Sequence, residues 1–275
     1  MFLKLLRYKF NAHRNLFIIL SAIALSMSAV GAGAMWLLEG DFVYKLEPEI
    51  LSVFAGLVCT LLISATYYGL IAYTIATAIL LLVQFYRNHF SDEGYLTFTL
   101  PATTHQHLLS SFLNILIWTT AAMFHLFICI IIMISPLYIS NNYLVETITD
   151  LMDFMSASGI ELPAVSIPML GISSLLTVCL LPMLAICIGC VAVKRKKLLA
   201  SFGIGYGIIS TFTISTYILI FLSMVADGYI SYEILNADKF HSVLTLLVTF
   251  TMQAGVCIGG YFLMHRLVDR KLNLP

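Results

Sequence analysis

Six long apolar runs, separated by short polar segments, dominate the pattern of hydrophobic and polar positions along the chain. Each run has at least the roughly 20 residues that an α-helix needs to cross the hydrocarbon core of a membrane. None of the runs contains Asp, Glu, Lys or Arg away from its ends. The pattern therefore predicts six membrane-spanning helices, at residues 16–38, 50–83, 108–139, 166–193, 198–226 and 241–264.

Two polar segments outside the runs show the spacing of amphipathic helices. Within residues 1–15, Lys4, Arg7 and Arg14 fall on one helical face and apolar side chains on another. A basic helix of this kind lies along the inner headgroups, although a frayed basic tail is the alternative. Residues 140–165 separate an apolar stripe from an acidic one in the same way. We expect this outer amphipathic segment to pack over the outer ends of the helices.

The second and third runs are longer than one membrane crossing requires. The run from Ile50 to Phe85 has 36 residues, or about 54 Å of helix at 1.5 Å per residue, whereas the hydrocarbon core is about 30 Å thick. The run from Thr104 to Ile139 is similar. We expect both helices to project beyond the inner membrane face, with tilting of the helices as the alternative.

Charged residues are few and are divided unevenly between the two sets of loops. Only 10% of residues are charged, compared with about 25% in soluble domains. Twelve of the 14 Lys and Arg residues flank the runs on one side, and only Lys45 and Lys239 lie on the other. Because Lys and Arg collect on the cytoplasmic side, both termini and the 86–107 loop are predicted to be cytoplasmic. Residues 1–275 then form a single all-α transmembrane domain.

The interior of the runs offers few groups for moving ions. His125 is the only titratable candidate at depth, and a lone histidine there is expected to form a hydrogen bond between helices. Ion-coupled carriers usually carry more intramembrane charge. The stretch Gly203-Ile-Gly-Tyr-Gly207 resembles a potassium filter, but it follows a Lys cluster and continues into a long run. We interpret its glycines as sites of close helix packing.

Residue patterns for catalysis are missing from the sequence. No G-x-x-x-x-G-K-[ST] loop for binding ATP phosphates occurs, and no catalytic triad or carboxylate pair appears on the inner side. Cys187-Ile-Gly-Cys190 has the spacing of a metal site, but a second ligand pair is absent. We therefore predict packing cysteines, no metal site, no cofactor in this chain and no enzymatic activity.

The polar stretch between the second and third runs carries the most specific pattern in the chain. It reads Ser91-Asp92-Glu93-Gly94-Tyr95-Leu96-Thr97-Phe98-Thr99-Leu100-Pro101. This stretch resembles the first cytoplasmic loop in six-span permease subunits of bacterial ABC exporters, which contains an S-D-E-G-Y-L-x-x-T-L-P run. In that family the loop carries a short coupling helix that docks on a separate nucleotide-binding subunit. The resemblance implies a partner-binding segment formed by Asp92, Glu93, Gly94, Tyr95, Leu96, Phe98, Leu100 and Pro101, with the apolar side chains in contact and the two acids at the rim.

The sequence departs from the family pattern in two places. Family members often have Lys or Arg just after the proline, whereas this chain has Thr103, Thr104, His105 and His107. Exporters of this fold also commonly place re-entrant outer helices between the fifth and sixth spans. Here the long outer segment lies between the third and fourth spans instead, which implies a differently built outer gate.

The resemblance implies a permease subunit of an ATP-driven exporter in a bacterial cytoplasmic membrane. Two permease chains, either identical or paired with a related chain, would enclose a path for a hydrophobic or amphipathic cargo, such as a lipid, a drug or a membrane-active peptide. ABC ATPase subunits, which hold ATP and Mg²⁺, would bind the 91–103 loops, and no nucleic-acid partner is expected. The alternative is a non-transporting membrane sensor, or an immunity protein that binds a membrane-active compound. A separate alternative concerns the loop alone, which would then be a solvated connector rather than a partner-binding segment.

Overall fold

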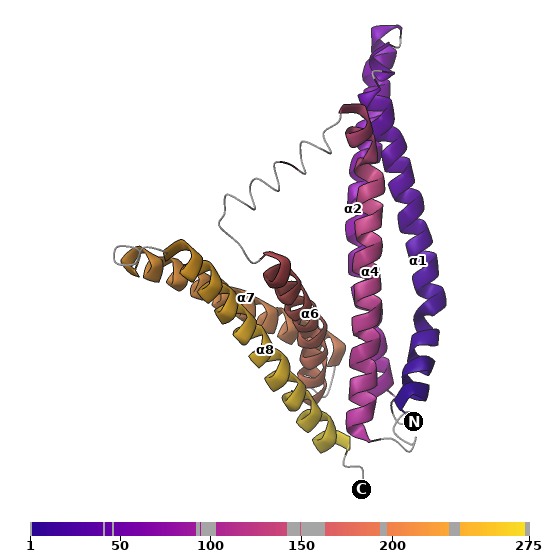
Figure 1. Ribbon diagram of the computed structural model, residues 1–275. Coiled ribbons are helices and arrows are strands. Elements are labelled where there is room, and N and C mark those ends of the chain that lie inside the picture. Colours follow the sequence, from indigo (N-terminus) through magenta and orange to yellow (C-terminus); the bar gives the residue numbers. More distant parts are fainter. Residues whose placement is uncertain are drawn as a thin grey trace. The chain divides into compact units, whose positions relative to one another are not determined.

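A computed structural model describes residues 2–40, 42–45, 47–91, 94, 103–141, 149, 163–192, 197–230 and 237–272. Within these residues every regular element is a helix (Figure 1). The long helices are α1 (Phe2–Glu39), α2 (Glu49–Phe90), α4 (Thr104–Asn141), α6 (Pro163–Ala192), α7 (Lys197–Ile230) and α8 (Ala237–Leu272), with a short 3-10 turn at Val43–Lys45. Each of the six contains a stretch long and apolar enough to cross a membrane. The predicted all-α fold with six spans is confirmed.

All six helices are longer than a membrane crossing requires, not only the two that the sequence singled out. They contain 30 to 42 residues, and the longest, α2, reaches about 63 Å at 1.5 Å per residue. The apolar pattern underestimates these lengths because the helices continue through polar residues at their ends. In α8, for example, the helix extends to Leu272 with an i,i+4 pair between His265 and Asp269.

The N-terminal segment is helical, but it is not a separate element. Helix α1 runs without a break from Phe2 to Glu39, because the residues around Asn15 include no Gly or Pro that would interrupt it. Lys4, Arg7 and Arg14 are exposed, as expected for a basic face. A distinct interfacial helix at residues 1–15 is therefore not confirmed. The outer 140–165 segment falls mainly outside the described residues.

The chain divides into two compact units, of which one comprises Arg7–Leu81 and Ile117–Asp153. In this unit α1, α2 and α4 run side by side (Figure 1). A buried cluster joins the three helices at Ala24, Leu70, Tyr73, Cys129 and Met133. Trp118 of α4 stacks against two rings of α1, with centroid separations of 4.7 Å to Phe10 and 4.3 Å to Phe17. Aromatic stacking of this kind adds roughly 0.5–1.5 kcal/mol per pair beyond the burial of apolar area.

His125 forms the hydrogen bond between helices that the sequence predicted. Its ring Nε2 donates to the backbone oxygen of Ser21 in α1 over 3.0 Å. The same nitrogen lies 3.6 Å from the sulfur of Cys129, and the ring packs against Tyr73 of α2 at a centroid distance of 5.6 Å. The histidine therefore links the three helices of this unit.

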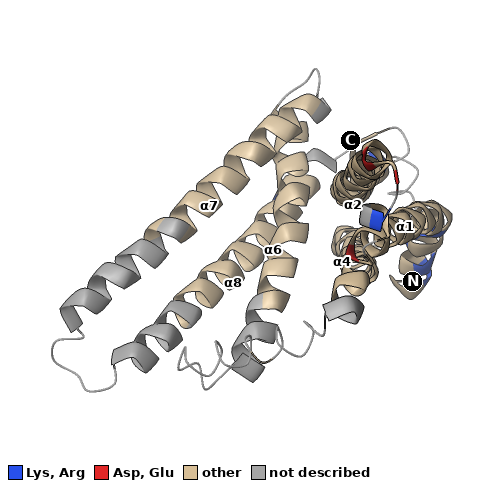
Figure 2. Cartoon of the chain, turned by 90° about the horizontal axis from the view of Figure 1, so that it is seen from above, with Lys and Arg blue, Asp and Glu red and all other residues tan. Residues whose placement is uncertain are grey.

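The second unit comprises Met1–Leu6, Leu82–Leu116 and Phe154–Pro275. Helix α6 is its most buried helix and packs against both α7 and α8. Figure 2 shows that the described parts of these helices carry almost no charged residue along their length. Cys187 and Cys190 are fully buried thiols on α6. Polar contacts between α6 and α8, such as Ser173 with Gln253, occur within this apolar packing.

The three glycines at 203–207 are interpreted from the sequence as sites of close helix packing, and the structure shows such packing at one of them. A Cβ on Gly205 would lie 3.2 Å from the Cβ of Ala185 on α6, so this residue does permit a close approach of two helices. A Cβ on Gly203 or Gly207 would meet no described atom within 4 Å. Among the described residues, close packing of two helices is therefore confirmed for the middle glycine and not for the outer two.

Candidate functional site

The structure describes the two ends of the predicted partner-binding loop rather than its centre. Of the implied contact residues only Gly94 is described, and the chain folds back there onto the end of α2. Its amide donates to the oxygen of Ser91 over 2.9 Å, and a Cβ on Gly94 would lie 2.9 Å from the carbonyl carbon of His89. A glycine is therefore required at this turn. The coupling helix and the remaining contact residues lie outside the described residues, namely Asp92, Glu93, Tyr95, Leu96, Phe98, Leu100 and Pro101.

A buried histidine joins the two helices that carry the loop. His89 lies in the last turn of α2, only 5% exposed, and its ring contacts both helices. Nδ1 donates to the oxygen of Phe85 over 3.1 Å. In the neutral ring Nε2 then accepts from the hydroxyl of Ser111 in α4 over 3.3 Å. This link holds the two ends of the loop close together.

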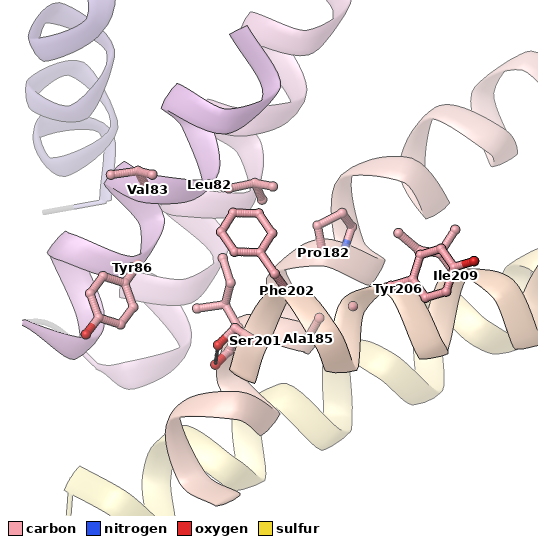
Figure 3. A pocket seen from close by; sticks show the side chains of 11 residues that line it. Leu82, Val83, Tyr86, Pro182, Ala185, Ser201, Phe202, Tyr206 and Ile209 are labelled. Atoms are coloured by element: carbon pink, nitrogen blue, oxygen red, sulfur yellow. Dashed lines mark hydrogen bonds between the residues drawn. The ribbon is translucent and has the colours of Figure 1, made fainter. Parts of the chain in front are cut away.

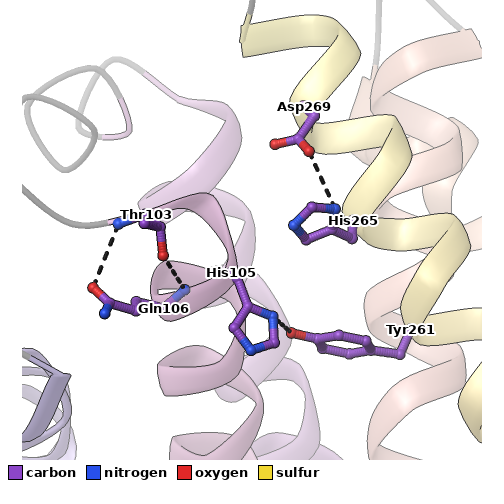
Figure 4. Close-up of polar contacts among 6 residues, drawn as sticks. All are labelled: Thr103, His105, Gln106, Tyr261, His265 and Asp269. Atoms are coloured by element: carbon purple, nitrogen blue, oxygen red, sulfur yellow. Dashed lines mark hydrogen bonds and ion pairs between the residues drawn. The ribbon is translucent and has the colours of Figure 1, made fainter.

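The start of α4 is fixed by a reciprocal cap. The Gln106 amide donates to Thr103 Oγ1 over 3.3 Å, and the Thr103 amide donates to Gln106 Oε1 over 3.4 Å (Figure 4). This T-x-x-Q arrangement is a capping box, which satisfies two amides that a helix N-terminus leaves unpaired. It could have been recognised in the sequence, and it would have moved the predicted start of the third span from residue 108 to 104.

Helix α8 contacts the same end of α4 through a polar group of side chains (Figure 4). The Tyr261 hydroxyl and His105 Nδ1 are 2.7 Å apart. The ring of His105 also lies 6.1 Å from that of His265, whose Nδ1 is 3.1 Å from a carboxylate oxygen of Asp269. His105 therefore makes a contact with another helix of the same chain. His107 is completely buried.

An apolar cavity of about 300 Å³ lies between the end of α2 and the helices α6 and α7 (Figure 3). Its wall is almost entirely carbon, with Leu82 and Tyr86 from α2, Pro182 and Ala185 from α6, and Phe202 from α7. Figure 3 shows the Phe202 ring pointing from α7 toward Leu82. The cavity adjoins the loop in sequence, because Ser91 follows Tyr86 by five residues.

Helices α6 and α7 approach each other closely where Gly189 faces the backbone of Ser201. A Cβ on Gly189 would lie 2.6 Å from the Ser201 Cα and 2.8 Å from its nitrogen. A backbone cannot move aside as a flexible side chain can, so the two helices must separate if a larger residue replaces this glycine.

Gly189→Ala should therefore destabilise the protein by roughly 1–3 kcal/mol, the usual cost of overpacking. Thermal unfolding of the purified protein in detergent, followed by size-exclusion chromatography, would measure the change. Gly203→Ala is the matched control, because a Cβ there meets nothing within 4 Å. Equal stability of the two variants would contradict the close approach at Gly189.

The second unit thus brings five helix ends together. Hydrogen bonds link the end of α2, the start of α4 and the C-terminal part of α8, and the cavity joins the end of α2 with α6 and the start of α7. These are the ends that the distribution of Lys and Arg predicts to lie on one side of the membrane. Among the described residues no three His, Cys, Asp or Glu side chains gather to hold a metal ion.

Comparisons with protein-family models, with curated proteins and with solved structures each find no match for this chain. A proposal for its function therefore depends on its own residues and on the loop resemblance that they carry.

Proposed function

We propose that this chain is the permease subunit of a bacterial ABC exporter in the cytoplasmic membrane. The observation that carries the proposal is the 91–101 stretch, which resembles a coupling loop at the nine specified positions of the S-D-E-G-Y-L-x-x-T-L-P pattern and lies between the second and third spans. The six span-length helices and the connected ends of α2 and α4 support it. Two such chains enclose the translocation path, and two ATPase subunits bind below it at the 91–103 loops.

The contacts at the loop ends suggest how ATPase motion reaches the spans. A force on the 91–103 loop acts on α2 and α4 together, because His89 and Ser111 join them. It also acts on α8 through the hydrogen bond between His105 and Tyr261. Both α2 and α4 are continuous helices of 42 and 38 residues, so a displacement at the loop propagates along rigid elements.

The character of the spans indicates the class of cargo. Their interiors lack Asp, Glu, Lys and Arg, so they provide no charged groups to bind an ion or a strongly polar solute. A hydrophobic or amphipathic cargo fits this surface, including a lipid, a drug or a membrane-active peptide. In this proposal ATP and Mg²⁺ belong to the partner ATPase, and the chain itself is not an enzyme.

Affinity purification from the membranes of the cell that encodes the protein should recover an ATPase with a G-x-x-x-x-G-K-[ST] loop. ATP turnover should accompany that complex and be absent from the isolated chain, which has no such loop. Mass spectrometry and a phosphate-release assay measure both results, and an unrelated tagged membrane protein serves as the control. Recovery of the chain alone, with a bound membrane-active compound and no ATPase, would favour the sensor or immunity protein instead.

A further inference from the structure

The cavity between α2, α6 and α7 has no role in the coupling proposal, yet its size and lining are those of a binding site. Its volume of about 300 Å³ falls at the lower end of the roughly 300–1,000 Å³ typical of ligand pockets. The Ser201 hydroxyl on its wall donates to the backbone oxygen of Ile186 over 3.5 Å. Polar groups available to a ligand are therefore scarce, and the occupant must be a hydrocarbon.

Water is a poor occupant for this space. A buried water needs two to four polar partners, and apolar cavities without them stay dry. An unfilled cavity also forfeits the dispersion contacts of its lining atoms. Phe202 and Tyr206 on the α7 wall are 51% and 78% exposed, so the cavity is open to its surroundings. Because α2, α6 and α7 are all of span length, those surroundings include lipid chains.

The residues beside the cavity fit a negatively charged headgroup. Tyr86, at the cavity wall, is followed directly by the exposed Arg87. Tyrosine and arginine are typical of the level at which membrane helices meet the headgroups. In the sequence five basic residues occur near these helix ends, one directly after Tyr86 and four in the run that leads from α6 into the start of α7, whereas the 91–103 loop contributes two acids. The basic residues are Arg87, Lys194, Arg195, Lys196 and Lys197, and the acids are Asp92 and Glu93. Basic sites between helices on the cytoplasmic side bind anionic headgroups.

We propose that this cavity binds one acyl chain of an anionic phospholipid, with the headgroup beside Tyr86 and Arg87. The bound chain fills the space between α2 and the α6–α7 pair, a few residues before the 91–103 loop. The lipid is thus a structural ligand of the end of α2 that leads into the 91–103 loop. This inference goes beyond the proposed function and does not depend on it, because a sensor or immunity protein with these helices would bind the same lipid.

The test uses the purified full-length chain, without any ATPase, in nanodiscs that contain a phosphatidylglycerol with a photoreactive diazirine on its acyl chain. After illumination, peptide mass spectrometry should place labels on the cavity residues Leu82 and Phe202. These sites should be labelled about tenfold more than Ile18, which is 58% exposed on α1. Equal labelling of Ile18 and the cavity residues would overturn the proposal.

Filling the cavity provides the specific control. Ala185→Phe places a ring where the acyl chain lies and should lower labelling of Phe202 about tenfold. Val178→Phe is on the same helix but 63% exposed, and it should leave that labelling unchanged. Leu82→Trp, at a partly exposed position of the cavity wall, repeats the test if Ala185→Phe fails to fold. Unchanged labelling of Phe202 in a folded filling variant would overturn the site.

Competition identifies the headgroup. Unlabelled phosphatidylglycerol should displace the probe at a several-fold lower mole fraction than phosphatidylcholine does. Arg87→Gln should reduce that preference, whereas Arg266→Gln, an exposed arginine on α8, should preserve it. Equal competition by the two lipids would overturn the anionic assignment.

Discussion

Phe98→Ala should weaken the association of the partner ATPase by roughly 2 kcal/mol or more, about 30-fold in affinity, and should abolish transport. In the proposed coupling the ATPase covers the apolar residues of the 91–101 stretch, which water would otherwise contact. Fully burying a side chain of this size stabilises by about 1.5–3 kcal/mol. Interface energy is concentrated in a few central residues that are often aromatic, so Phe98 and Tyr95 are the expected anchors.

The measurement is co-purification of the ATPase, together with efflux or cargo resistance, in cells that express each variant at equal level. Asp92→Ala, at the expected rim of the contact, is the matched control and should cost much less. Phe98 lies between α2 and α4 rather than within a span, so membrane insertion should be unaffected by either change. A Phe98→Ala variant that retains its ATPase and its transport would identify the loop as a connector only.

The six helices could be predicted because each depends on a local pattern. A run of apolar residues long enough to cross a membrane identifies itself, since lipid tolerates few other structures. The residues at which the helices begin and end are less predictable, because the helices extend beyond the apolar runs into polar residues. The capping box of Thr103 and Gln106 and the His265–Asp269 pair stabilise turns that hydropathy alone assigns to loops. Their signals lie in side-chain hydrogen bonding rather than in hydrophobicity.

The surroundings of the loop could not be predicted in the same way. The contacts of His89 with Ser111 and of His105 with Tyr261 join residues 22 and 156 positions apart. Such pairs depend on how helices pack, and no local spacing encodes them. For His125 the sequence predicts the type of contact but not the residue that makes it. A lone histidine in an apolar run is expected to find a hydrogen-bond partner on another helix, but only the structure identifies that partner as Ser21.

A cysteine introduced at Ser156 or Asn236 should react with a membrane-impermeant reagent in intact cells, whereas one at Ser91 should react only after the membrane is permeabilised. The distribution of Lys and Arg predicts this orientation, and the structure adds an independent constraint. The ends of α2, α4 and α8 that meet through His89 and His105 must lie on the same side of the membrane. Labelling of a cysteine at position 91 therefore shows on which side of the membrane all three helix ends lie.

The unsubstituted chain is the control for this labelling, and its background should be low. Five of its six cysteines are buried, and Cys257 is partly buried in α8. Quantitative mass spectrometry of the labelled peptides would then give an all-or-none difference between Ser91→Cys and the two outer positions. Strong labelling of Ser91→Cys in intact cells would place the 91–103 loop outside the cell, where no ATPase could reach it. That result would overturn both the orientation and the proposed coupling to ATP.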